Sequence, residues 1–395
     1  MIMVFLRLCF VLLADFQLTV KQKLGKKGKK MDDIQAIIKI VSKNKIKRLD
    51  IISLNKSRTK LFKLYELIQE GVIQSDEDAI KILYPKKSKN KRKSYFKLKY
   101  LLKRRLMNTI FFINLTPNEY DENSVHYEAL RKLTEIRILA SQDIVGLSLK
   151  MAKKLLPKVE KYEFWDVAFF LTRMIRRIYV IKAPDSKKFQ EFNLKLNQIQ
   201  EINNLLVESE GLYYQLLSQI IQAKSSNIDI HLQAKEMEKI LGAQMSSNTS
   251  IRIFFFFSAI IAIKYMTNYE YDNAKVVLTT SLEKIQSQKL FQHLSRVYLA
   301  NLVACNIYLR QFEEGTENLQ KAYALTKEGS FNWFQLKSTN IALAFHANAY
   351  DHVWSHYHEA IRHKNFSSIP KVFRKVWKLY YAWIYLLNVM GRLSL

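Results

Sequence analysis

Glycine and proline are scarce in this chain of 395 residues, which holds 9 Gly and 5 Pro. Average usage of about 7% Gly and about 5% Pro would give roughly 47 of the two together. Tight turns between short strands usually draw on these residues. Their scarcity therefore argues against a sandwich or barrel of many short strands.

Cysteine is scarcer still, with Cys9 and Cys305 alone. Two cysteines exclude a disulfide framework and a cysteine-rich zinc module, and they fit a reducing compartment. The chain also lacks Gly-rich phosphate loops and the G-x-S-x-G, H-E-x-x-H and C-x-x-C motifs. Its carboxylates are scattered. We therefore expect a cytoplasmic protein that is not an enzyme and has no catalytic residues and no cofactor.

Long hydrophobic runs are missing as well. Residues 1–14 are apolar apart from Arg7, but this run is shorter than the about 20 residues of a membrane span. Six lysines follow it between residues 21 and 30, whereas a secretory signal carries its charge first. Met31 then opens a sequence typical of an ordinary start. We expect residues 1–30 to be a mis-annotated start; a short anchor or unusual signal is the alternative.

Positive charge is what the chain has in excess, and it is unevenly distributed. The net charge is +28, and residues 1–120 hold 28 Lys+Arg against 10 Asp+Glu, a net of +18. A boundary near Pro117 therefore separates a basic region, residues 31–118, from a larger region, residues 119–395. Apolar residues recur at helical spacing in both, and no stretch alternates long enough for a strand. The sequence predicts an all-α fold.

The basic region contains helix punctuation and one very basic segment. Gly71 is placed to end a helix and Ser75 to cap the next. Residues 86–105 then hold eleven cationic residues: Lys86, Lys87, Lys89, Lys91, Arg92, Lys93, Lys97, Lys99, Lys103, Arg104 and Arg105. Interleaved Tyr95, Phe96 and Tyr100 could stack on bases while the cations meet phosphates. Contact with anionic lipid, or a solvated helix with its aromatics in the core, is the alternative.

The carboxyl-terminal half contains a repeat. Tyr271, Phe312 and Tyr350 lie 41 and 38 residues apart, and each is predicted to open the second helix of a hairpin. A slim residue follows each after three positions, a large one after seven and a small one after ten. These are Ala274, Leu278, Ser281; Gly315, Leu319, Ala322; and Val353, Tyr357, Ala360. Small residues let two helices approach closely, and an earlier Trp165-Asp166-Val167-Ala168 matches the start of this pattern.

This pattern, carried by residues 251–365, resembles the tetratricopeptide-type helical repeat. The resemblance implies a superhelical array of stacked hairpins, preceded by the smaller basic region. Such arrays normally end in a polar capping helix, so one interpretation of the apolar carboxyl-terminal residues is that the array is truncated there. It also implies a non-catalytic protein–protein interaction scaffold whose partner is another protein or a peptide. An irregular helical domain is the alternative fold. The alternative function is nucleic-acid binding through residues 86–105, and we expect no membrane partner.

The resemblance also implies a binding face formed by the first helix of each hairpin. Its positions are Phe256, Ala259, Ile263, Met266, Val297, Ala300, Ala304, Tyr308, Gln335, Ser338, Ala342 and His346. The competing interpretation is that several of these residues are ordinary core.

Two further features lie near the end of the chain. His352 and His356 are four residues apart, so both could reach one ion, but no second ligand cluster accompanies them. We expect a solvated helix face there and no metal. Residues 372–390 are rich in aromatic and aliphatic side chains, which suggests self-association through this helix or a longer array.

Overall fold

The structure, a computed structural model, describes residues 34–35, 37–38, 59–73, 75–85, 90–110, 122–222, 229–245 and 250–392. The predictions for residues 1–30 and for Lys86, Lys87 and Lys89 lie outside these ranges. Every regular element in the described ranges is a helix, with fifteen α-helices and two short 3-10 helices. The predicted all-α fold is confirmed. None of the helices in these ranges has both the length and the apolar character needed to cross a membrane.

The chain divides into two compact units, Val20–Arg131 and a larger one that includes Lys132–Leu395. The division falls within α6 (Glu122–Ser141), after the boundary predicted near Pro117.

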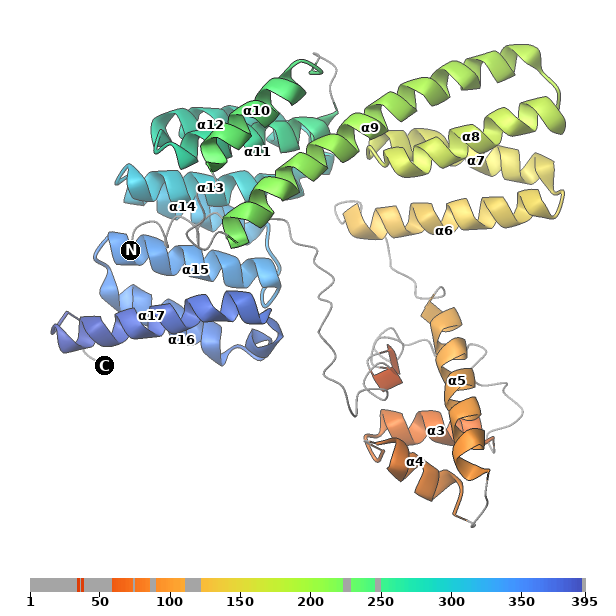
Figure 1. Cartoon of the computed structure of the whole chain (residues 1–395), viewed down its shortest axis with the longest axis horizontal. Coiled ribbons are helices and arrows are strands. Elements are labelled where there is room, and N and C mark those ends of the chain that lie inside the picture. Colours follow the sequence, from red (N-terminus) through yellow and green to blue (C-terminus); the bar gives the residue numbers. More distant parts are fainter. Residues whose placement is uncertain are drawn as a thin grey trace. The chain divides into compact units, whose positions relative to one another are not determined.

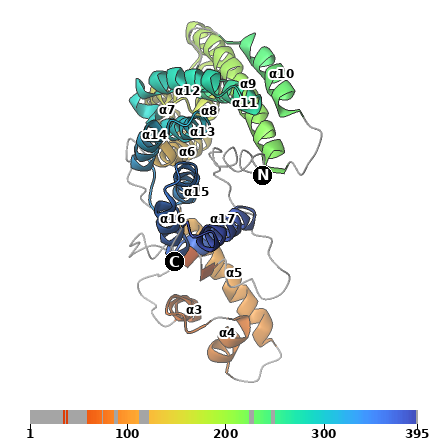
Figure 2. The ribbon, with the colours of Figure 1, turned by 90° about the vertical axis from the view of Figure 1, so that its left-hand side faces the viewer.

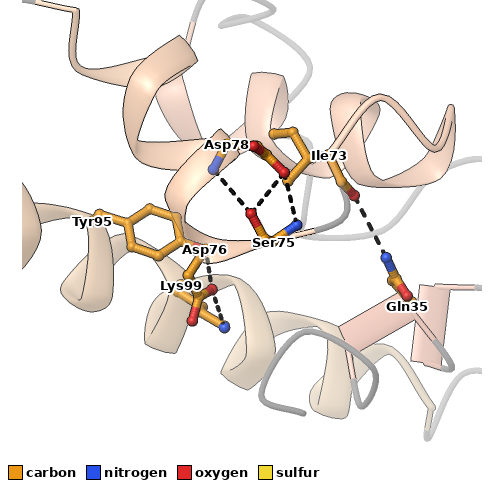
Figure 3. Close-up of polar contacts among 7 residues, drawn as sticks. All are labelled: Gln35, Ile73, Ser75, Asp76, Asp78, Tyr95 and Lys99. Atoms are coloured by element: carbon orange, nitrogen blue, oxygen red, sulfur yellow. Dashed lines mark hydrogen bonds and ion pairs between the residues drawn. The ribbon is translucent and has the colours of Figure 1, made fainter. Parts of the chain in front are cut away.

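The smaller unit contains α3 (Lys60–Gln69), α4 (Asp76–Leu83) and α5 (Lys91–Ile110), which contact one another pairwise. Gly71, at φ +75°, follows the end of α3 in the left-handed conformation that glycine adopts without strain. Ser75 caps α4: its hydroxyl accepts from the Asp78 backbone N–H, and the Asp78 carboxylate accepts from that of Ser75 (Figure 3). Both predicted helix boundaries are confirmed.

The larger unit is a succession of antiparallel helices. Its first part contains α7 (Val145–Lys161), α8 (Trp165–Ile181), the long α9 (Ser186–Gln222) and α10 (Ile230–Gly242). Three hairpins follow: α11 (Ile251–Thr267) with α12 (Tyr271–Gln286), α13 (Ser295–Tyr308) with α14 (Phe312–Ala324), and α15 (Phe331–His346) with α16 (Tyr350–Arg362). Helix α17 (Lys371–Val389) comes last, and the 3-10 helices are η1 (Lys289–Leu294) and η2 (Phe366–Ser368). The three aromatic residues of the predicted repeat open α12, α14 and α16.

One turn geometry recurs five times, between α6 and α7, α7 and α8, α11 and α12, α13 and α14, and α15 and α16. In each turn a non-glycine residue adopts a φ of 54° to 65°, and the next helix starts two residues later; these residues are Asp143, Glu163, Tyr269, Arg310 and Asn348. The following residue donates its N–H to a carbonyl five positions back, as Gln311 does to Asn306 at 2.8 Å. This bond and its 5→2 companion form the Schellman arrangement, which satisfies carbonyls at the end of the first helix.

The main contacts in the larger unit join helices that are adjacent or next but one in chain order. From α11 to α17 the helices follow one another down one stack, which is visible in two perpendicular views (Figures 1 and 2). Helix α9 contacts α8 and also α10 and α11, so it joins α8 to the stack that begins at α11 (Figure 1). A continuous apolar core runs from Tyr213 to Leu387. Contacts that are limited to helices close to one another in the chain are typical of helical repeat proteins.

Helix α7 contains a proline, Pro157, and continues through it to Lys161, although proline usually stops or kinks a helix. Leu155, Leu156 and Val159 around it are buried. Burial of these side chains therefore outweighs the loss of one backbone hydrogen bond.

Candidate partner-binding groove and basic helix

The small residues of the repeat lie where helices approach. Ala274, Ala322 and Ala360 are fully buried, and Val353 is 1% exposed. At Gly315, an added Cβ would lie 3.1 Å from Cδ1 of Leu343 and 3.4 Å from Cβ of Asn306. Helix α14 therefore packs closely against α13 and α15 at this glycine.

Hydrogen bonds between a serine and a tyrosine hydroxyl link the first helix of one hairpin to the first helix of the next. The sequence did not lead us to predict these bonds. The Tyr298 hydroxyl of α13 lies 2.5 Å from the Ser258 hydroxyl of α11, and the Tyr380 hydroxyl of α17 lies 2.6 Å from the Ser338 hydroxyl of α15. All four residues are buried. Helix α17 thus occupies the place of a further first helix. The Ser–Tyr separations of 40 and 42 residues are close to the repeat spacing, and this signal could have revealed the link.

Most of the predicted partner-binding positions are in the core. Nine are buried: Ala259, Ile263, Met266, Val297, Ala300, Ala304, Gln335, Ser338 and Ala342. First helices are covered by their own second helix and by the neighbouring hairpins, so they present little open surface. Phe256 is half-buried against Tyr213 and Tyr214. Tyr308 and His346 reach the surface, and the structure brings these two together.

Tyr308 and His346 border a groove with a volume of about 670 Å³. The groove is formed by the ends of α13 and α15, the turns that follow them, and α17. Its lining residues are Ile307, Tyr308, Arg310, Phe312, Phe345, His346, Asn348, Trp383, Leu386, Leu387 and Met390. We name this site the α13–α17 groove.

Aromatic packing shapes the groove. The Tyr308 ring stacks on the Tyr271 ring, with centroids 4.3 Å apart and planes 4° apart. On the other contact of Tyr308, the centroid of the His346 ring lies 6.5 Å from that of Tyr308. Phe345 packs against Trp383 of α17 with centroids 5.1 Å apart. The described lining is thus mainly apolar, with polar groups at its margin. Partial burial of the His346 ring lowers its pKa, and Arg310 is exposed.

In the basic segment, α5 divides its residues between two faces. Tyr95, Leu102 and Leu106 are fully buried in the core of the smaller unit, while Phe96 and Tyr100 are 39% and 68% exposed. Among the predicted cations, Lys91, Arg92, Lys93, Lys97, Lys103 and Arg104 are exposed and Arg105 is partly so.

Two residues of the predicted basic surface, Tyr95 and Lys99, are buried instead of exposed. Lys99 is 7% exposed and forms an ion pair with Asp76, and the Tyr95 hydroxyl donates to the same carboxylate at 2.6 Å (Figure 3). Burial and the hydrogen bond with Asp76 raise the pKa of Tyr95. These two side chains hold α5 against α4. Helical periodicity could have placed them in the core, because they share a face with Leu102 and Leu106.

His352 and His356 of α16 border a smaller pocket of about 390 Å³ between α14, α15 and α16. The rings of His352 and His356 lie 6.2 Å apart, and Lys337 reaches into the same region and pairs with Glu359 at 2.5 Å. Within the described ranges, no three His, Cys, Asp or Glu residues are grouped as metal ligands. The pocket therefore combines imidazole, amide and lysine groups around a partly apolar floor.

Helix α17 has one uncovered side in the described structure. Tyr381, Tyr385, Val389 and Met390 are each more than half exposed, whereas Tyr380, Ile384 and Leu387 pack into the core. Trp383 and Leu386 connect the exposed side with the α13–α17 groove.

Comparison with protein-family models, with curated proteins and with solved structures finds no significant match for this chain.

Proposed function

We propose that this chain is a non-catalytic protein–protein interaction scaffold built on tetratricopeptide-like helical repeats. The observation that carries the proposal is a hairpin turn with one residue in the left-handed backbone conformation. This turn recurs five times, and the next helix always starts two residues after that residue. Three of these turns precede the aromatic residue of the sequence repeat. Repeated hairpins of this kind expose grooves at their edges and act mainly through binding. The proposal includes a cytoplasmic location, supported by the presence of only two cysteines.

The proposed binding site is the α13–α17 groove. Its volume lies in the range of about 300–1,000 Å³ that is typical of ligand pockets. Apolar and aromatic residues such as Phe312, Phe345 and Trp383 suit a large apolar side chain, which would gain free energy by leaving water. Arg310 lies at the margin, and no carboxylate is among the described lining residues. We therefore expect a peptide segment that places an acidic residue next to a large apolar one.

Selection of peptides against the full chain tests this proposal. A displayed library of random twelve-residue peptides should yield sequences with an aromatic or aliphatic residue beside Asp or Glu. Synthetic versions of these peptides should change the tryptophan emission of the chain, because Trp383, one of its five tryptophans, lines the groove. Fluorescence titration then gives the Kd for each peptide and each variant.

The decisive variant is Leu386→Glu with Met390→Glu. Both side chains are exposed in the groove, at 54% and 67%, so the variant should fold while it repels an acidic, apolar peptide. We expect at least about tenfold weaker binding. Leu194→Glu with Val207→Glu, on the exposed surface of α9, is the matched control and should bind normally. Equal binding by the groove variant and the native chain would contradict the proposal.

A further inference from the structure

The exposed face of α5 carries an ordered row of side chains. Successive residues of an α-helix are rotated by about 100°, so the side of α5 that faces water can be read from its positions. The exposed residues Lys93, Phe96, Lys97, Tyr100, Lys103, Arg104 and Met107 all fall within an arc of about 120°. The buried residues Tyr95, Lys99, Leu102 and Leu106 lie on the opposite side. We name the exposed row the α5 strip.

The strip interleaves cations with aromatic rings. Phe96 and Tyr100 are one helical turn apart, and Lys93, Lys97 and Arg104 flank them on the same side. From Lys93 to Met107 the strip extends about 21 Å along the helix axis. The sequence contains no Asp or Glu between Asp78 and Glu119, so α5 itself contributes no carboxylate that would repel a polyanion.

We propose that the α5 strip binds single-stranded nucleic acid, with Phe96 and Tyr100 stacking on unpaired bases while Lys93, Lys97 and Arg104 contact phosphates. Non-specific proteins that bind single strands combine these two elements, a basic track along the backbone and aromatic platforms for successive bases. A duplex would offer phosphates but no exposed base faces to the two rings. The rings therefore favour a single strand over a duplex. This binding is additional to the protein–protein role of the larger unit.

The strip fits a nucleic acid better than a lipid surface. A helix that lies in a membrane interface needs a broad, continuous apolar face. The apolar face of α5 packs into the core of the smaller unit through Tyr95, Leu102 and Leu106. The strip itself offers Phe96, Tyr100 and Met107 separated by cations. Separate rings between charges match the alternation of bases and phosphates along a strand.

The test uses fluorescence anisotropy of labelled 20-nucleotide poly(dT) and poly(U) with the full chain, over a series of salt concentrations. The native chain should bind at low salt, and its affinity should fall as salt rises. In K93Q/K97Q/R104Q the slope of log K against log salt should shrink by about 2, since each phosphate contact on a single strand contributes about 0.7. K154Q/K158Q/K161Q, which removes three exposed charges from α7, is the matched control and should keep the slope.

The aromatic residues are tested separately with F96A/Y100A. Loss of stacking should weaken binding by about tenfold or more for each ring and leave the salt slope unchanged. Comparison of poly(dT) with poly(U) shows whether the strip prefers DNA or RNA, and either result supports the proposal. Binding to vesicles of phosphatidylcholine with phosphatidylserine tests the alternative, in which the strip binds an anionic lipid surface. The proposal is overturned if the native chain does not bind either strand at low salt, if the α7 control loses as much as the strip variant, or if the strip variants lose vesicle binding alone.

Discussion

The carboxylate of Glu163 lies at the amino terminus of α11, where its Oε1 accepts a hydrogen bond from the backbone N–H of Ile251 at 2.9 Å. Its Oε2 accepts from the Arg252 N–H at 3.0 Å and from the Ser250 hydroxyl at 2.7 Å. Glu163 belongs to the turn between α7 and α8, and 88 residues separate it from Ile251. One carboxylate thus satisfies free N–H groups at a helix start and ties two distant hairpins together.

Substitution at Glu163 should therefore destabilise the larger unit. Glu163→Ala removes three hydrogen bonds to a charged acceptor, and we expect a loss of about 2 kcal/mol in the free energy of unfolding. Glu163→Gln keeps the shape but removes the charge, so we expect a loss of about 1 kcal/mol. Urea denaturation followed by circular dichroism measures both.

Glu201→Ala is the control for this experiment. Glu201 is exposed on α9 and has the same side chain, but it caps no helix. This variant should unfold at the same urea concentration as the native chain. A Glu163→Ala variant that also unfolded there would show that the cap does not contribute to stability.

The close approach at Gly315 gives a second prediction. Gly211, within α9, has no neighbour within 4 Å of an added Cβ, so Gly211→Ala should raise the free energy of unfolding by about 1 kcal/mol. Gly315→Ala gains the same helix propensity but forces Leu343 to move, and its net effect should be smaller or negative. Gly315→Leu should destabilise by about 1–3 kcal/mol or more because the core is overpacked.

The comparison between the two glycines is made by thermal and urea unfolding of the full chain. Because both glycines lie inside helices, the difference between the two alanine variants isolates the packing against Leu343. Equal stabilisation by both substitutions would show that α14 does not approach α13 and α15 as closely as the structure indicates.

The sequence was informative wherever a local rule operates. Periodicity predicted the helices, Ser75 and Gly71 marked helix ends, and the aromatic residue of each repeat marked the start of a second helix. Pro157 shows the limit of local rules: proline disfavours a helix locally, but the burial that keeps α7 intact depends on neighbouring helices.

Long-range pairings are what the sequence could not supply. The Glu163 cap and the Lys99–Asp76 pair each join residues that only the tertiary fold brings together. For the partner-binding face, motif positions were assigned to a surface although nine of them are buried. A repeat motif identifies which residues face a neighbouring helix, but the exposed edge depends on how many neighbours cover it.

The environment of His356 makes stability depend on pH. Burial, followed by the positive charge of Lys337, lowers the pKa of His356, while Glu359 acts in the opposite direction and His352 adds a small further lowering. In the unfolded chain histidine titrates near pH 6.5. Below that pH the unfolded state takes up a proton that the folded state resists, so stability falls as the pH falls.

His356→Gln should therefore reduce the loss of stability on acidification. Between pH 7.5 and pH 5.5 the free energy of unfolding should drop less in the variant than in the native chain, by at most about 1.4 kcal/mol. His352→Gln, at an exposed position one turn away, is the control and should change the drop much less. Identical pH profiles for His356→Gln and the native chain would contradict the assigned environment.

Cys305 provides a direct probe of unfolding in the stack. It is fully buried in α13, and burial raises its pKa to about 12. Because the thiolate is the reactive form, the folded protein should not react with a thiol reagent at pH 8, whereas the unfolded chain should react rapidly. A Cys9→Ser variant leaves Cys305 as the single thiol and makes the readout unambiguous.

With the reagent in excess, the labelling rate of Cys305 in increasing urea should follow the opening of α13. If α11 and α13 unfold together, Glu163→Ala should shift the curve of labelling rate against urea to lower urea concentrations. Rapid labelling of the native chain without urea would show that α13 is not enclosed by its neighbours.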